Sequence, residues 1–520
     1  MNRHKMKRLV SGAVMTTLAM SVAACSPGAG KPAEGGGGKA ASGKDGPLDI
    51  SIMAPIFKTT YPKDHSPVAA ELEKYTNANI HFEWTPNSSY GDKFNITLAS
   101  GKLPTVMVAL DKGASFVNAV RSGAFWELGP YLKDYPNLSK ANPIVLNNTS
   151  IDGKIYGVYR ARALGRNAIV YRKDWLENLN MQPPKTIDDF YQMLKAFTYN
   201  DPDKNGKNDT YGMVVSKWTG GWAGPLDQIA LWFGAPNKWG EDAGGKLQPA
   251  FLTKEYMDAL KFMKKLYDEK LINQDFAVFD TAKYNDPLNN SQAGVIVDVA
   301  DAAARIEDKI HQAQEKAGKD DKSKQFMDVV GSVSGPKGLR ALPTSGYAGM
   351  IAISKSGAKT EKELRQVLGF LDKMNDEKAQ ILSGNGIEGK HYTKVQGGVE
   401  PSKDTNLLES ELEGLNQILN FLPEDRTLKV VQTPIRQKQD QVQKENEKIV
   451  VPNPAEPLIS NVYTQKGPQL DNIINDARVK FIVGQINEAG YQAALDLWKK
   501  SGGDDYVKEI NELYSKSKSK

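Results

Sequence analysis

The chain has 520 residues, of which 40% are hydrophobic and 25% charged, so it is long enough for two or more globular domains. Its formal net charge of +5 falls to 5 − 4 = +1 without the first 24 residues, which hold four basic side chains and no acid. This balance gives no support for nucleic acid binding. The single cysteine, Cys25, excludes an intrachain disulfide, a cysteine-based zinc site and catalytic thiol chemistry.

The N-terminal segment has the pattern of an export signal. Residues 1–8 are basic, and residues 9–24 are apolar and small but too few for a convincing membrane span. The segment ends in V-A-A-C, which resembles the lipobox of bacterial lipoproteins and predicts a lipid, such as palmitate, on Cys25. An ordinary cleavage with Cys25 as a bystander is the alternative. Residues 25–46 are rich in Gly, Ala, Ser and Lys and predict a flexible tether. We therefore expect a body anchored to the extracellular face of a bacterial cell membrane.

The next part of the chain alternates between strand and helix patterns. Strands are expected at 48–54, 80–84 and 104–110, with helices at 66–76 and 92–101. This order is typical of a parallel α/β sheet, whose ligands lie beyond the carboxyl ends of the strands. Asp111, at the exit of the third strand, is therefore a candidate binding residue, although an exposed loop is the alternative.

Residues 201–212 read D-P-D-K-N-G-K-N-D-T-Y-G and have the spacing of a calcium loop. Position 12 is Gly212 in place of the usual glutamate, so Thr210, water or a distant carboxylate would have to complete the coordination. A solvated turn is the alternative. The predicted Ca²⁺ ligands are Asp201, Asp203, Asn205, the backbone carbonyl of Lys207, Asp209 and Thr210.

A cluster of tryptophans follows this loop, interspersed with glycines. Flat indole rings stack on the C–H face of sugars, so Trp218, Trp222 and Trp232 are candidate sugar-stacking residues. Burial in a core is the alternative for each, because tryptophan is highly buried on average.

Several longer motifs resemble one known family. D-G-K-I-Y-G, N-A-I-V-Y-R-K-D-W-L, P-K-T-I-D-D-F-Y-Q-M-L-K-A-F, the acidic loop and the closing G-Y-Q-A-A-L-D-L-W-K-K-S-G-G-D-D-Y occur in order along the chain. Together they resemble the family 1 extracellular solute-binding lipoproteins of ABC transporters, in the branch similar to the LipO, LplA and alginate-oligosaccharide-binding proteins.

The resemblance implies an α/β, two-lobed periplasmic-binding-protein-like fold with a hinge and an interlobe cleft. It also implies a calcium site in the second lobe, and crossings between lobes that make Tyr159, Arg160, Arg162 and Tyr347 candidates for binding the solute. The implied division is a signal peptide at 1–24, a tether at 25–46, lobe 1 at 47–158 and 347–400, and lobe 2 at 159–346 and 401–520.

The function implied is a monomeric binding protein that captures an oligosaccharide and delivers it to the permease subunits and ATPase of an ABC importer. A peptide- or signal-binding lipoprotein of the same fold is one alternative. A secreted carbohydrate-active enzyme is another, but the chain has no H-E-x-x-H, G-x-S-x-G or P-loop motif. We therefore predict that the protein is not an enzyme.

Overall fold

The computed structural model describes residues 46–518, apart from residues 59, 219–222, 320, 421 and 423. The predicted signal peptide, Cys25, most of the predicted tether and Trp222 lie outside the described residues. Within the described part, every helix is too short or too polar to cross a membrane.

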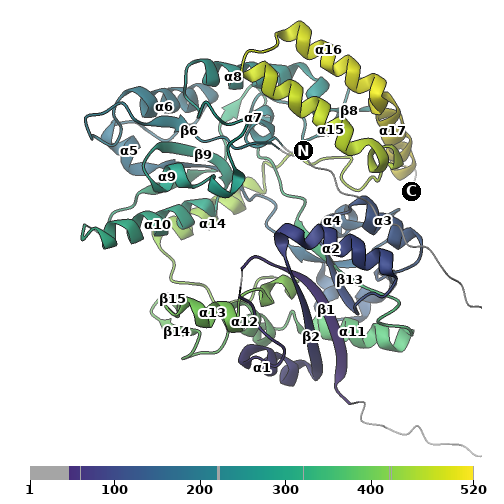
Figure 1. Cartoon of the computed structure of the whole chain (residues 1–520). Helices are drawn as coiled ribbons and strands as arrows, with labels where there is room; N and C mark the ends of the chain where they lie inside the picture. Colours follow the sequence, from purple (N-terminus) through teal and green to yellow (C-terminus); the bar gives the residue numbers. More distant parts are fainter. Residues whose placement is uncertain are drawn as a thin grey trace, which may run out of the picture. The chain divides into compact units, whose positions relative to one another are not determined.

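The first lobe is built around a mixed sheet with the strand order β2-β1-β3-β13-β4. Figure 1 labels β1, β2 and β13 of this sheet. Strand β1 pairs in parallel with β2 and β3, which confirms the parallel arrangement predicted for this part of the chain. Strand β13 returns much later in the sequence and runs antiparallel to β3 and β4. The strands are β1 (Leu48–Ile56), β2 (Ala78–Pro86), β3 (Val106–Ala109), β4 (Gly157–Ala161) and β13 (Tyr347–Ile353).

Helices of the first lobe bury their apolar faces against this sheet. In α1, for example, Val68 and Leu72 are fully buried in the same core as Ile50 and Ile80 of the strands. The helices are α1 (Pro67–Thr76), α2 (Asn87–Ser100), α3 (Ala114–Arg121), α4 (Pro143–Thr149), α11 (Glu361–Lys373), α12 (Glu377–Asn385) and α13 (Thr405–Glu411), and the hairpin is β14 (Tyr392–Val395) with β15 (Gly398–Pro401).

The second lobe contains another sheet, with the order β10-β5-β9-β6. Helix α6 (Ile187–Tyr199) covers it and starts at a capping box, in which the Thr186 side chain accepts from the Asp189 backbone and the Asp189 side chain accepts from the Thr186 backbone. The strands are β5 (Asn167–Arg172), β6 (Tyr211–Met213), β9 (Ala293–Val299) and β10 (Met327–Val330), and the helices nearby are α5 (Lys173–Asn178), α7 (Leu226–Trp232), α8 (Lys254–Asp268), α9 (Asp286–Asn289), α10 (Ala302–Lys316) and α14 (Pro434–Asn446).

The C-terminal helices belong to the second lobe. Figure 1 shows α15 (Asn461–Ile482), α16 (Glu488–Trp498) and α17 (Asp504–Lys518) in yellow, with α15 beside α8. Ile474 and Phe481 of α15 and Trp498 of α16 are buried in the core beneath α8.

The lobe boundaries of the structure differ in part from those expected from the sequence. Strand β4 keeps residues up to Ala161 in the first sheet, three residues beyond the expected boundary at 158. Residues after 401 also stay with the first lobe, because Leu415 and Leu419 are fully buried in its core. The chain enters the second lobe at α14, where Ile435 is buried with β5 and β10. Apolar burial in the turn after α13 therefore places the last crossing later than predicted.

Candidate functional site

A cavity of about 510 Å³ lies between the two lobes. The first lobe contributes Asn148 from α4, and the second lobe contributes Asp298 and Val299 from the end of β9. Most of the remaining wall comes from the crossings at 162–167 and 342–345 and from the segment 450–456 between α14 and α15. These residues are Arg162, Leu164, Arg166, Asn167, Leu342, Pro343, Thr344, Ser345, Val450, Pro452, Asn453 and Glu456, together with Ile144 from α4 and Asn237 and Lys238 from the second lobe.

Glu456 is the best-organised acidic group of this cavity. Its carboxylate accepts hydrogen bonds from Ser345 Oγ at 2.6 Å and from Asn453 Nδ2 at 3.0 Å. Burial acts to raise the pKa of Glu456, but Lys238, the Ser345 hydroxyl and Lys112 outweigh it and hold that pKa below its usual value. Glu456 is therefore a fixed carboxylate that can accept hydrogen bonds from a ligand.

Lys112 connects the lobes behind this carboxylate. Its Nζ donates to the backbone carbonyls of Asn148 at 2.7 Å and of Glu456 at 2.8 Å. Burial lowers the pKa of Lys112 to about 8, although Glu456 acts in the opposite direction. The ammonium thus joins α4 to the segment that carries Glu456.

Arg162 is a cationic group of the cavity that the protein leaves available. Its side chain is exposed, and its backbone N–H donates to the Gly346 carbonyl at 3.0 Å. No ion pair joins its guanidinium to another described residue. The neighbouring Arg166, in contrast, pairs with Asp301 through two hydrogen bonds of 2.9 Å. The predicted binding residue Arg162 therefore lies on the cavity wall with its donors free for a ligand.

Asp298 provides a second acid on the opposite wall. Burial raises the pKa of its carboxyl group, and the cations Arg305 and Arg166 only partly offset this effect. In the described part of the chain it forms no ion pair. The cavity thus presents both hydrogen-bond donors and acceptors that protein partners do not saturate.

Three other predicted residues gather close to the cavity without lining it. Tyr347 begins β13, and burial, Glu456 and Asp111 raise the pKa of its hydroxyl group. Arg160 donates from Nη1 to the Ala348 carbonyl at 2.8 Å, while its Nε has no partner. Burial lowers the pKa of Arg160 to about 10. Asp111 is exposed and lines a separate hollow of about 250 Å³ in the first lobe.

The structure corrects three of the predicted binding residues, because it buries them in cores. Tyr159 is 2% exposed, and its hydroxyl oxygen accepts from the Asn142 backbone N–H at 2.7 Å, since alternation along β4 turns it away from the side of Arg160. Trp232 is fully buried against Phe190. Trp218 is 7% exposed and donates to the Gly224 carbonyl at 2.7 Å. In this structure none of the three offers a ring face to a solute.

Sequence reasoning missed Glu456 and Lys238. Glu456 lies in the segment P-N-P-A-E-P, a proline-rich interruption of the helical C-terminal region, and this interruption was a signal for a non-helical segment. Two aromatic side chains at the carboxyl end of β1, Phe57 and Tyr61, are 56% and 43% exposed. Exposed rings at a strand end are more suitable for stacking than the buried tryptophans.

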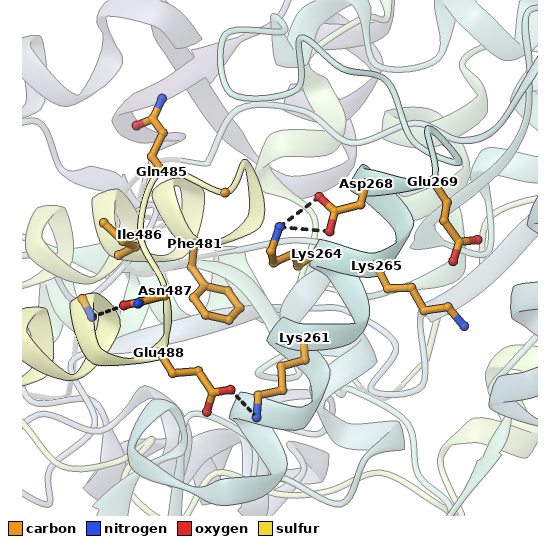
Figure 2. A pocket seen from close by; sticks show the side chains of 12 residues that line it. Lys261, Lys264, Lys265, Asp268, Glu269, Phe481, Gln485, Ile486, Asn487 and Glu488 are labelled. Carbon is orange, nitrogen blue, oxygen red and sulfur yellow. Dashed lines mark hydrogen bonds and ion pairs between the residues drawn. The ribbon is translucent and has the colours of Figure 1, made fainter.

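A larger surface hollow of about 850 Å³ lies between α8 and the start of α16, and its charged groups largely neutralise one another. Figure 2 shows Lys264 beside Asp268 and Lys261 beside Glu488, with ion pairs of 2.9 and 2.8 Å. Since these charges are paired across an open surface, the hollow is a weaker candidate for a binding site than the interlobe cavity.

The acidic loop gathers three carboxylates around Asn205. The Asn205 amide nitrogen lies 2.9 Å from Asp203 Oδ2 and 3.2 Å from Asp209 Oδ1, and its backbone N–H donates to Asp201 Oδ1 at 3.1 Å. Burial, together with Asp201 and Asp209, raises the pKa of Asp203. All these oxygen groups suit a hard cation. However, within the described residues no three acidic, histidine or cysteine side chains are arranged to hold a metal ion.

Thr210 is not placed as a ligand of this loop. It is buried, and its hydroxyl donates to the Phe197 carbonyl at 2.8 Å in helix α6. The prediction that Thr210 completes a metal site is therefore corrected, because its side chain points into the core of the second lobe.

The fold and the interlobe cavity define a substrate-capturing protein of two lobes, and comparison with known proteins gives its class. Residues 59–381 match the family model described as bacterial extracellular solute-binding protein. The chain belongs to this family, which confirms the predicted family and the two-lobed α/β fold.

Two relatives from Bacillus subtilis (strain 168) are similar over nearly their full lengths. Lipoprotein LipO is 52% identical, over 90% of this chain and 93% of its own length. The polygalacturonan/rhamnogalacturonan-binding protein YtcQ is 36% identical, over 92% and 94%. A solved structure of the Streptococcus pneumoniae substrate-binding protein FusA, an EF-hand mutant in complex with fructo-nystose, has a TM-score of 0.65 and 19% identity, covering 91% of this chain and 99% of that one.

Proposed function

We propose that this protein is the solute receptor of an ABC importer, anchored to the outer face of the membrane by a lipid on Cys25, and that it binds an oligosaccharide in the interlobe cavity. The observation that carries this proposal is the cavity itself, where Arg162, Asp298 and Glu456 converge from distant segments. The relatives support the class of ligand, because YtcQ is named for binding polygalacturonan and rhamnogalacturonan and FusA is solved in complex with fructo-nystose.

The chemistry of the cavity favours a polyhydroxylated ligand over one dominated by a single charge. Sugar hydroxyls both donate and accept hydrogen bonds, and the cavity offers cationic donors at Arg162 and Lys238 and acceptors at Glu456 and Asp298. Its volume is within the range of ~300–1,000 Å³ that is usual for small-molecule sites.

Transfer to the importer requires two conformations of the binding protein. The segments between β4 and β5, between β10 and β13, and before α14 connect the lobes and would act as the hinge. A ligand that contacts both walls of the cavity stabilises the closed state, so the permease subunits and their ATPase can distinguish loaded from empty receptor.

A calcium ion in the acidic loop would have a structural role. Asp201, Asp203, Asn205 and Asp209 would hold it, and its charge would stabilise the ionised form of Asp203, whose pKa is raised by burial and, to a smaller extent, by Asp201 and Asp209. The EF-hand for which the FusA mutant is named supports a site of this type. The loop precedes β6, so the ion would stabilise the second lobe at a distance from the interlobe cavity.

A thermal-shift screen tests the proposed function. The purified protein is incubated with fragments of polygalacturonan and rhamnogalacturonan, fructo-oligosaccharides and a set of short peptides, and the sugar samples are then analysed for cleavage products. We expect a rise in melting temperature with at least one oligosaccharide, no peptide effect and intact sugars. Stabilisation by peptides alone would contradict the proposal, and so would release of shorter sugars.

A further inference from the structure

A second cavity, of about 320 Å³, lies within the second lobe. Helix α15, the hairpin β7 (Trp239–Glu241) with β8 (Leu247–Pro249), and helix α7 surround it. We call this cavity the aromatic chamber, because rings form much of its wall. The aromatic residues are Trp239, Phe251, Tyr256, Tyr463, Trp498 and Tyr506.

The charged groups of the aromatic chamber balance one another. Asp227 and Asp471 face Lys238 and Arg478, so the formal charges sum to zero. Asp471 accepts a hydrogen bond from the Tyr463 hydroxyl at 2.8 Å. Asp227 accepts from the Ala223 backbone N–H at 2.8 Å. An anionic ligand would meet two carboxylates here, whereas a neutral one would find both donors and acceptors.

Arg478 is the unusual residue of this chamber. It is 5% exposed, and its Nη1 donates to Asn475 Oδ1 at 2.8 Å. Its guanidinium lies over the rings of Tyr256 and Phe251, at 5.3 and 5.8 Å from their centroids. Among the described residues its Nε makes no hydrogen bond, and its charge acts on the nearby buried Tyr491 hydroxyl. A buried charged donor without a hydrogen-bond partner is unfavourable, so a hydroxyl group in the chamber would be favoured.

The aromatic chamber adjoins the interlobe cavity. Asn237 and Lys238 line both cavities. The Lys238 side chain is exposed, and its charge acts on both Glu456 and Asp471. Lys238 therefore lies where a ligand that occupied both cavities would pass.

We propose that the aromatic chamber is a binding subsite for one neutral sugar ring, the terminal unit of an oligosaccharide whose remainder lies in the interlobe cavity. The rings of Phe251, Tyr463 and Tyr506, which are not fully buried, contact the C–H surface of the sugar, and Arg478 Nε donates to one of its hydroxyl oxygens. The inference rests on the proposed function where it assigns the rest of the oligosaccharide to the interlobe cavity. Binding of a single sugar ring in the chamber does not depend on that function.

The test uses monosaccharides, so that it does not depend on knowing the complete ligand. The protein is labelled with ¹⁵N-tryptophan, and its indole signals are assigned by Trp→Phe variants. Galactose, rhamnose, glucose and fructose are the neutral probes, and galacturonic acid is the anionic probe. We expect at least one neutral sugar to shift the Trp239 and Trp498 signals more than galacturonic acid does, while those of Trp84 and Trp126 in the first lobe stay in place. The inference is overturned if no neutral probe shifts Trp239 and Trp498, or if galacturonic acid shifts them more.

A space-filling variant gives a second readout. Ala250 lines the chamber, so Ala250→Leu should abolish the monosaccharide shifts, and Ala494→Leu, which packs on the same core outside the chamber, should preserve them. Arg478→Met replaces Ala250→Leu if that variant does not fold. Full retention of the shifts in the folded chamber variant would also overturn the inference.

The outcome is separable from that of the proposed function. If no oligosaccharide stabilises the protein in the thermal-shift screen, the proposed function fails, whereas the monosaccharide experiment still reports on the chamber. If an oligosaccharide binds wild type and Ala250→Leu equally, only the chamber inference fails. We expect at least a tenfold loss of affinity in Ala250→Leu.

Discussion

The acidic loop at residues 201–212 and the interlobe cavity both collect charged side chains, but they are assembled in opposite ways. In the loop, Asp201, Asp203 and Asp209 come from one short stretch and surround Asn205. In the cavity, Arg162 comes from the crossing between β4 and β5, and Glu456 comes from the distant segment between α14 and α15. The loop groups hydrogen-bond to one another, whereas in the described part of the chain the cavity leaves Arg162 and Asp298 without an ion pair.

This difference separates a site that stabilises a lobe from a site that binds a solute. Polar groups that are satisfied locally contribute to the stability of one lobe and have little left to offer a ligand. Groups held at a crossing between lobes remain available, and they change their surroundings when the lobes move. Variants in the two regions should therefore affect different measurements.

The largest effect is expected at Glu456. The variant Glu456→Gln replaces with a neutral amide the carboxylate that Ser345, Asn453 and Lys238 stabilise. We therefore expect oligosaccharide affinity to fall ~100-fold and the free energy of unfolding to fall by about 2–3 kcal/mol. Calorimetric titration and urea unfolding measure the two effects. Glu409→Gln, which removes the partner of Lys58 at the surface, is the control and should change stability by less than about 0.5 kcal/mol. Equal effects in both variants would contradict the central role of Glu456.

The acidic loop should respond to metal and not to sugar. We expect EDTA to lower the melting temperature and Ca²⁺ to restore it, with a stabilisation of about 2.7 kcal/mol at a hundredfold excess over Kd. Asp203→Ala should remove the calcium response and leave sugar affinity unchanged.

The variant Thr210→Val tests whether the buried Thr210 hydroxyl is a calcium ligand or only a hydrogen-bond donor within the core. It should lower stability by about 1 kcal/mol, because the hydrogen bond to Phe197 is lost, and keep the full calcium response. Loss of that response in Thr210→Val would restore Thr210 as a ligand.

Substitution of Arg162 should weaken sugar binding with little effect on stability, which is the reverse of what we expect for the loop residues. Arg162→Met removes an exposed cation that has no ion pair with a described residue, so we expect oligosaccharide affinity to fall ~10–50-fold with a stability change within about 0.5 kcal/mol. Arg305→Met is the matched control, since Arg305 pairs with Asp301 outside the cavity wall. An unchanged affinity in Arg162→Met would remove this residue from the site.

The smallest effect concerns Asp298 and depends on pH. Burial raises its pKa above the unfolded value, so the charged carboxylate costs stability at neutral pH, and this cost disappears as the pH falls through the raised pKa. Asp298→Asn should therefore raise the free energy of unfolding at pH 7 by about 1 kcal/mol, with a smaller gain near pH 4.5. Urea unfolding at both pH values measures this difference. A variant less stable than wild type at pH 7 would show that the carboxylate is not a cost to the fold.

The acidic loop was easier to predict from the sequence than the interlobe cavity, because its residues are neighbours in the chain. The spacing within residues 201–212 brings its carboxylates together, because local turns alone determine that geometry. The capped start of α6 at Thr186 was equally accessible, since a capping box involves only four consecutive residues.

The cavity was only partly accessible from the sequence. Arg162 was found through its place near a crossing, but Glu456 depends on a contact with Lys112, 344 residues away. The prediction for the tryptophans failed in the opposite way, because it assigned buried side chains to the binding site. Their spacing among glycines cannot tell an exposed face from a buried one, and the packing of Trp232 against Phe190 is decided by the tertiary fold.

The most direct measurement of solute binding in the interlobe cavity is a calorimetric titration of wild type, Glu456→Gln and Arg162→Met with the oligosaccharides of the thermal-shift screen. We predict saturable one-to-one binding of at least one oligosaccharide to wild type, with clearly weaker binding to both variants. Absence of binding to every oligosaccharide, or equal affinity in all three proteins, would contradict the assignment of this cavity as the binding site.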